Sequence, residues 1–222
     1  MEVIYNKTEA EERTFVQKLV NTAWPDLHPV VGQVLGRGGQ ATVYKLAFVD
    51  GHSEALKVID TSVYRDPARR KDANRRGRSE IRYQKQLSGK TDTVVKFYDS
   101  ASSCERGQDA PMCFLLRMEL LTPLDPKNLA ALDPANREKA VLQIMRDVLE
   151  GLCQTEDAGI VHRDVKCGNI LLRHDPATGQ SRFVLSDFGL ARPFHTRTDR
   201  SFFTVCGSSD HIAPEILSLI HI

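Results

Sequence analysis

The sequence predicts an α+β fold in two lobes: a small lobe built on five antiparallel strands with one helix, followed by a mainly helical lobe. Two alternating strand patterns flank a glycine cluster in Val30–Asp50, as in a hairpin. A charged helical pattern, Arg65–Leu87, interrupts the strands, and the pattern turns helical after Leu121–Leu124. We therefore expect an N-terminal extension over 1–30, a sheet lobe over 31–121 and a partial helical lobe over 122–222.

The elements before this boundary follow from local patterns. Glu9–Trp24 reads as a short amphipathic helix, because apolar residues recur near a 3.6-residue period. The third strand is expected at Glu54–Asp60, the fourth at Thr93–Asp99 and the fifth at Met112–Leu120. The apolar residues of the first helix are Phe15, Leu19 and Val20. Gly77 weakens the charged helix by roughly 1 kcal/mol relative to alanine.

The second lobe is expected to contain one long helix and two short strands. Asp133 is a suitable cap and Pro134 a suitable first helical residue. The strands are expected at Ile170–Leu172 and Phe183–Leu185. One apolar stripe runs along the helix, through Val141, Ile144, Met145, Val148, Leu149 and Leu152.

Composition excludes several classes of protein. The chain has 222 residues, a net charge of +1, 41% hydrophobic and 27% charged residues, as in ordinary globular proteins. This charge favours neither a nucleic-acid nor a membrane partner, and no apolar run reaches membrane-spanning length. Five irregularly spaced cysteines favour free thiols in a reduced, cytoplasmic compartment. A nuclear address in the basic stretch 69–78 is the alternative, although acidic residues interspersed there favour a solvated helix face.

Two features of the first lobe suit phosphate binding. Gly36, Gly38 and Gly39 would let a hairpin backbone approach phosphate oxygens, although such glycines also serve as ordinary turns. Lys57 alternates with apolar neighbours on the third strand. A buried lysine needs a partner, and Glu80 on the following helix is the best candidate. An exposed ion pair is the alternative.

The segment 159–169 lies between an apolar helix and an apolar strand and concentrates polar groups. Asp164 can accept a proton from an incoming hydroxyl, and Lys166 can neutralise a transferring phosphoryl group. Asn169 and, after the next strand, Asp187 offer oxygen ligands to Mg²⁺. Together these groups indicate phosphoryl transfer.

Over about Val31–Leu217, the chain resembles the eukaryotic-type protein kinases of the serine/threonine class, because it carries three of their motifs in the same order. The motifs are His162-Arg163-Asp164 with Lys166 and Asn169, then Asp187-Phe188-Gly189, then Ala213-Pro214-Glu215. The resemblance implies a bilobal kinase fold with ATP and Mg²⁺ in the cleft. It makes Asp164 the catalytic base and Asn169 and Asp187 the Mg²⁺ ligands. Lys57, paired with Glu80, would hold the α- and β-phosphates. The implied nucleotide site comprises Leu35, Gly36, Gly38, Gly39, Val43, Ala55, Lys57, Met118, Glu119, Leu121, Asp125 and Leu171.

The resemblance also implies regulation and partners. Protein substrates would offer serine or threonine hydroxyls, and an upstream kinase would act on Thr204 in an activation segment. Arg163, Arg192 and Arg76 would receive the phosphate. Gln84 departs from the family, which usually has an apolar residue there.

The sequence ends seven residues after Glu215, where the family continues with further helices. We therefore expect an incomplete helical lobe whose apolar stripe is left exposed. A kinase-like protein that binds a nucleotide or a partner without catalysis is the alternative function. A small-molecule phosphotransferase is disfavoured by the activation segment. The oligomeric state does not follow from the sequence.

Overall fold

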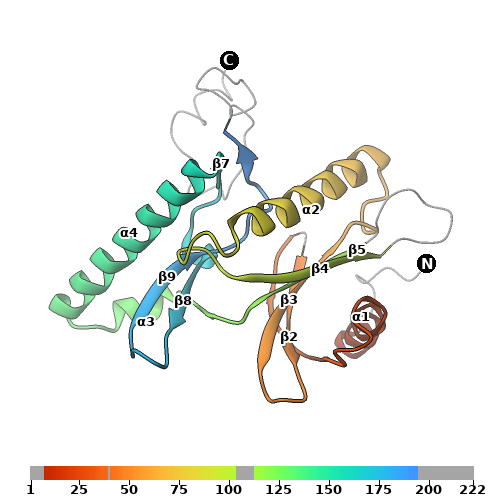
Figure 1. Cartoon of the computed structure of the whole chain (residues 1–222), viewed down its shortest axis with the longest axis horizontal. Helices are drawn as coiled ribbons and strands as arrows, with labels where there is room; N and C mark the ends of the chain where they lie inside the picture. The colour runs from red at the N-terminus through yellow and green to blue at the C-terminus, as the bar shows by residue number, and fades with distance from the viewer. Residues whose placement is uncertain (1–7, 40, 104–112, 195–222) are drawn as a thin grey trace. The chain divides into compact units, whose positions relative to one another are not determined.

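The computed structural model describes residues 8–39, 41–103 and 113–194, and Figure 1 shows their elements. The chain divides into two compact units, Met1–Ile81 with Phe97–Leu120 and Arg82–Lys96 with Leu121–Ile222. The second unit resumes at Leu121, where the sequence places the lobe boundary. The segment Arg82–Lys96, expected in the first lobe, groups with the second unit instead.

A five-stranded antiparallel sheet forms the first unit, as the sequence predicts, with the order β1-β2-β3-β5-β4. Together with the helices, it confirms the α+β class. The strands are β1 (Val30–Arg37), β2 (Ala41–Ala47), β3 (Ser53–Asp60), β4 (Phe97–Ser103) and β5 (Cys113–Glu119).

The predicted position of the fourth strand is wrong. We expected Thr93–Asp99, whereas β4 runs over Phe97–Ser103. Val94 instead forms a parallel bridge with Leu185, and Val95 N–H donates to the Leu185 carbonyl over 2.9 Å. Val94 and Val95 therefore pair with Leu185 inside the second unit and are not part of β4. The polar residues after them pair with β5 through the backbone, which requires no apolar side chain.

Strand register separates the two faces of the sheet. Val43 lies opposite Lys57, and Lys57 lies opposite Leu116. Ala55, two residues before Lys57 on β3, lies opposite Met118. Directly opposite residues share a face, as do residues two apart on one strand. One face of the sheet therefore carries Val43, Ala55, Lys57 and Met118 together.

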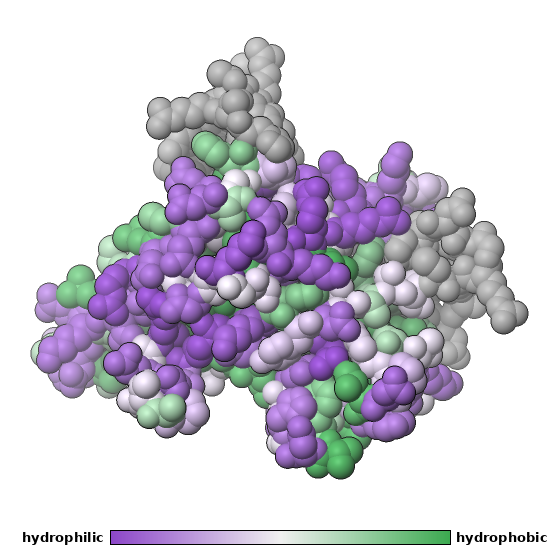
Figure 2. All heavy atoms as spheres, in the orientation of Figure 1, coloured by the Kyte–Doolittle hydropathy of each residue, from purple (hydrophilic) through white to green (hydrophobic). Residues whose placement is uncertain are grey.

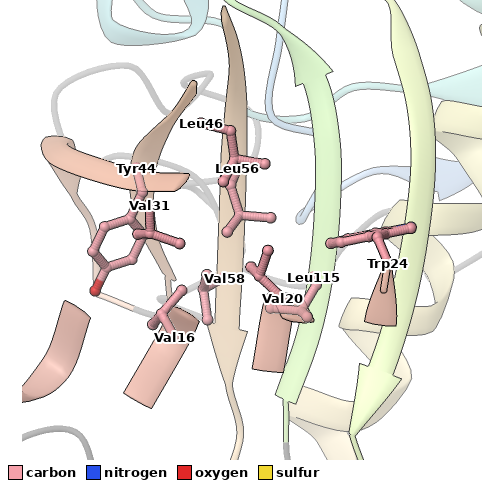
Figure 3. Packing of buried hydrophobic residues seen from close by; sticks show 9 residues of the cluster. All are labelled: Val16, Val20, Trp24, Val31, Tyr44, Leu46, Leu56, Val58 and Leu115. Atoms are coloured by element: carbon pink, nitrogen blue, oxygen red, sulfur yellow. The ribbon is translucent and has the colours of Figure 1, made fainter. Parts of the chain in front are cut away.

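The helix α1 (Glu9–Ala23) covers the opposite face. It begins with a capping box in which Thr8 and Glu11 bond reciprocally. Val16 and Val20 are fully buried, whereas the predicted Phe15 and Leu19 are only partly buried. Adjacent apolar residues on a helix leave open which one faces the sheet. Figure 3 shows the cluster of Val16, Val20, Trp24, Val31, Tyr44, Leu46, Leu56, Val58 and Leu115.

The helix α2 (Pro67–Leu87) is rich in arginine and lysine, and hydrophilic spheres cover it in Figure 2. Its midpoint approaches the sheet closely. A Cβ atom added at Gly77 would lie 2.6 Å from Cδ2 of Phe114 on β5. Gly77 therefore permits close packing of helix on sheet, a role that the sequence did not reveal.

The second unit contains a long helix, a short helix and two small sheets among its described residues. A three-stranded sheet has the order β6-β8-β9, and β10 pairs with β7. The elements are β6 (Thr122–Pro123), α3 (Pro126–Ala130), α4 (Pro134–Asp157), β7 (Ile160–Val161), the 3₁₀ turn η2 (Cys167–Asn169), β8 (Ile170–His174), β9 (Ser181–Leu185) and β10 (Arg192–Pro193).

The start of α4 is as predicted, because the Asp133 side chain accepts from the backbone N–H of Asn136 over 3.1 Å. On its buried face, Asp147 accepts from the backbone N–H of Phe183 on β9. Half of the predicted apolar stripe is exposed, with Met145 54% and Leu149 57% accessible, whereas Val148 is buried. Hydrophobic spheres lie among hydrophilic ones over α4 in Figure 2.

Two expectations from composition concern thiols and membranes. Cys113, Cys153 and Cys167 are free cysteines within the described ranges. Across the same ranges, no helix combines the length and the apolar character that crossing a bilayer would require.

Candidate active site

The expected ion pair of the first unit is present. Lys57 on β3 places its Nζ 2.5 Å from Oε1 of Glu80 on α2. The two side chains are only 9% and 2% exposed. Burying two charges has a large desolvation cost, which close pairing offsets. The arrangement holds an ammonium group at a defined place on the sheet face that also carries Val43, Ala55 and Met118.

The glycine hairpin between β1 and β2 is closed by Gly38, whose N–H donates to the Ala41 carbonyl over 2.8 Å. A Cβ atom added at Gly36 or Gly39 would meet nothing within 4 Å, and none of the three glycines has a positive φ. Neither packing among the described residues nor backbone conformation requires glycine at Gly36 and Gly39. The predicted approach of phosphate to the backbone at these two glycines stays a prediction.

The residues predicted to bind the nucleotide base divide between the two units. Val43, Ala55 and Met118 share the Lys57 face of the sheet. Leu35 on β1 is 39% exposed, and Glu119 is the last residue of β5. All five belong to the first unit.

The other three predicted nucleotide contacts belong to the second unit. Leu121 directly precedes β6, and Leu171 lies on β8. Asp125 is exposed and caps α3, where its carboxylate accepts from the Lys127 backbone N–H over 2.9 Å. Its predicted contact with the ribose stays a prediction.

The predicted catalytic residues of the second unit converge on one carboxylate. Lys166 Nζ lies 2.9 Å from Oδ2 of Asp164. Asn169 Nδ2 donates to the same oxygen over 2.9 Å and to the Asp164 backbone carbonyl over 2.8 Å. These two bonds fix the Asn169 amide and leave its Oδ1 as the oxygen suited to a cation. The donor set therefore fits Mg²⁺, which prefers oxygen ligands.

Ser186 joins this loop to Asp187. Its N–H and Oγ donate to the Asn169 carbonyl over 2.9 and 3.0 Å. His162 Nδ1 accepts from the Asp164 backbone N–H over 3.3 Å, so Nε2 carries the proton and donates to the Ser186 carbonyl. The His162 ring also lies 4.8 Å from that of Phe188. The sequence analysis missed Ser186, and its place between a buried strand and Asp187 is the signal that could have indicated it.

Two site residues have strained backbones. Arg163, just before Asp164, has φ of 69°, and Asp187 has φ of 64°. For residues other than glycine, the left-handed region costs about 1–2 kcal/mol each. Such strain is typical of functional sites, where the surrounding structure holds a side chain in place. Here the strained residues are Asp187 itself and Arg163, which precedes Asp164.

Most of the predicted activation segment, from residue 195 onward, lies outside the described residues. This applies to Thr204 and to Glu215 of the last motif. Their predicted roles stay predictions.

Comparison with known proteins identifies the family of this chain. A family model described as "Protein kinase domain" matches residues 30–221. The chain therefore belongs to the protein kinase family.

Similar proteins include the probable serine/threonine-protein kinase fhkE of Dictyostelium discoideum, 28% identical over 91% of this chain and 27% of the relative. Serine/threonine-protein kinase PLK4 of Aedes aegypti is 30% identical over 85% of this chain and 22% of the relative. The CBL-interacting serine/threonine-protein kinase 1 of Arabidopsis thaliana is 28% identical over 85% of this chain and 39% of the relative. The chain thus spans well under half the length of these relatives.

Proposed function

We propose that this chain transfers the γ-phosphoryl group of ATP to serine or threonine hydroxyls of protein substrates. The observation that carries the proposal is the carboxylate of Asp164, held by Lys166 and Asn169 in one loop and linked through Ser186 to Asp187. The family match and the serine/threonine kinases among the similar proteins support it.

In this proposal, Asp164 accepts the proton of the substrate hydroxyl as its oxygen bonds to the γ-phosphorus. The bond from that phosphorus to the bridging oxygen breaks, and ADP leaves with the electron pair. Lys166, 2.9 Å from Asp164, lies beside the reacting hydroxyl and offsets negative charge on the transferring group. Lys57 binds the α- and β-phosphates and is oriented by Glu80.

Asn169 and Asp187 would hold the metal through Oδ1 of the amide and through the carboxylate. Mg²⁺, when bound, neutralises charge on the phosphates of ATP. The left-handed backbone of Asp187 and the two bonds that fix the Asn169 amide hold these oxygens in place beforehand.

Transfer of labelled phosphate from Mg·ATP to a generic protein substrate, followed by phosphoamino-acid analysis, tests the proposal. Asp164→Asn should lower the transfer rate at least about 10²-fold, while affinity for a fluorescent ATP analogue is retained. Asp157→Asn, the same substitution at an exposed position on α4, is the matched control.

A wild-type chain that neither transfers phosphate nor binds Mg·ATP would refute the proposal. Saturable binding without transfer would support the alternative of a nucleotide-binding protein without catalysis.

We extend the proposal to regulation by an upstream kinase acting on Thr204. A phosphate adds nearly two negative charges, which arginines near the catalytic loop, such as Arg163 and Arg192, can receive. Transfer activity that is the same in Thr204→Ala as in the wild type, after treatment with a cell extract and ATP, would exclude this switch.

A further inference from the structure

Glu12 is a buried carboxylate outside the region that the family model matches. It lies on α1, four residues before Val16 and eight before Val20, and so belongs to the face that packs on the sheet. It is only 3% exposed. A charged residue on a buried apolar face needs strong partners, because an unpaired buried charge is costly.

Both partners come from the glycine hairpin. The Arg37 guanidinium, at the end of β1 between Gly36 and Gly38, donates to both Glu12 oxygens, over 2.9 and 2.7 Å. The hydroxyl of Tyr44 on β2 donates to Oε1 over 2.5 Å. A two-point bond between arginine and carboxylate is strong and directional. Glu12 thus accepts hydrogen bonds from both strands of the hairpin, from Arg37 on β1 and from Tyr44 on β2.

Burial alone would raise the pKa of Glu12, but the hydrogen bonds from Arg37 and Tyr44 outweigh it and lower the pKa. Burial and the Glu12 carboxylate raise the pKa of Tyr44. Glu12 is therefore an ionised acceptor and Tyr44 a neutral donor at ordinary pH, as the two hydrogen bonds require.

Other side chains of α1 and its C-cap also form hydrogen bonds with the same sheet. Gln17 accepts from the backbone N–H of Val31 over 2.7 Å, which fixes the start of β1. Trp24 donates to Asp99 on β4 over 2.7 Å, and the Arg117 guanidinium lies 5.2 Å from the Trp24 ring centre. Figure 3 shows Val16, Val20 and Trp24 directed at the sheet. The helix therefore forms hydrogen bonds with both ends of β1, through Gln17 and Val31 and through Glu12 and Arg37.

We infer that α1 positions the phosphate-binding hairpin, with Glu12 acting through Arg37 and Tyr44 and without touching the nucleotide. A hairpin with three glycines has much backbone freedom, and restraining it before binding reduces the entropy lost when phosphate binds. This inference rests on the proposed function, because it assigns the hairpin to Mg·ATP. It makes the N-terminal helix a part of the nucleotide site.

The test compares Glu12→Gln, Arg37→Gln and the double variant in the full chain. Glu11→Gln is the matched control, since it makes the same charge change at an exposed neighbour and glutamine also suits a capping box. The measurements are the Kd of a fluorescent ATP analogue with Mg²⁺, the KM for ATP, kcat and the melting temperature.

We expect each single variant to raise Kd and KM by about 5-fold, the lower end of usual coupling between sites, with kcat at saturating ATP almost unchanged. The double variant should raise Kd and KM no further than either single variant, because each single variant already removes the same Glu12–Arg37 interaction. Glu11→Gln should match the wild type. Hydrogen exchange of the amides in 36–43 should be faster in Glu12→Gln without nucleotide.

A lower melting temperature with unchanged Kd and KM would overturn the inference, because Glu12 would then be only structural. If Glu12→Gln does not fold, Arg37→Gln decides the question, since that side chain is 49% exposed. If the wild type binds no nucleotide, the proposed function fails together with this inference. Normal binding by the wild type and equal binding by the variants refutes this inference alone.

Discussion

Gly77 provides the sharpest test of how α2 packs on the sheet. In an exposed helix, replacing glycine by alanine stabilises by about 1 kcal/mol. Gly77 is buried, however, and a Cβ atom there would lie 2.6, 2.7 and 3.1 Å from Cδ2, Cε2 and Cγ of Phe114. Carbon atoms in contact prefer about 3.5–4.0 Å, so the new methyl group overlaps the ring by about 1 Å. The ring is only 2% exposed and has little room to move.

Overpacking of this kind costs about 1–3 kcal/mol. After subtracting the helix-propensity gain of about 1 kcal/mol, Gly77→Ala should destabilise the protein by about 1 kcal/mol and at most by about 2. Each 1 kcal/mol corresponds to a fall in melting temperature of about 2–4 °C in a chain of this size. Because Glu80 follows Gly77 by three residues on α2, a shift of the helix also lengthens the 2.5 Å contact with Lys57. Activity should therefore fall as well.

Thermal and urea unfolding of Gly77→Ala, Phe114→Leu and the double variant measure this effect. Leucine makes room for the methyl group, so the double variant should be less destabilised than the sum of the two single variants. A higher melting temperature for Gly77→Ala, with unchanged activity, would show that the helix is not held against Phe114 and would refute the reasoning.

Three further predictions concern one other glycine and two buried polar side chains. Gly36→Ala should leave the melting temperature unchanged, because a Cβ atom there meets nothing within 4 Å, but it should raise the KM for ATP. If the protein also lost stability, the argument that glycine is needed there for close approach of phosphate would be contradicted. Gln84→Met should raise the free energy of unfolding in urea by about 1–3 kcal/mol. The reason is that neither polar atom of this fully buried amide has a hydrogen-bond partner among the described residues. A lower free energy of unfolding would show that the amide is hydrogen-bonded after all. The pKa of Glu12 is lowered from its ordinary 4.5, so its stabilisation is complete above about pH 4.5 and is lost as pH falls through the lower, folded value. The melting-temperature gap between the wild type and Glu12→Gln should therefore narrow in acid, and a gap that widens would show the opposite shift.

Local signals were sufficient to predict much of the fold and several contacts of the candidate site. The start of α4 could be predicted because Asp133 and Pro134 act within one helical turn. The pair of Lys57 and Glu80 could be predicted because an inward lysine needs a carboxylate and few are suitably placed. Gln84 was recognised as an unusual residue, although its complete burial was not foreseen.

Long-range packing decided what the sequence could not. The apolar residues around Val94 pair with Leu185, about ninety residues away, so the fourth strand begins later than its pattern indicates. Phe114 explains Gly77, although local propensity counts that glycine as a defect.

The sequence by itself therefore determined which groups have the chemistry suited to phosphate and metal, because motif spacing and side-chain chemistry are local properties. Only the tertiary structure decided how the hairpin is held. Glu12 is one of several charged residues in an ordinary helix pattern, and its partner Arg37 follows twenty-five residues later. Contacts between residues that far apart depend on how helix and sheet pack, and no local pattern encodes that packing.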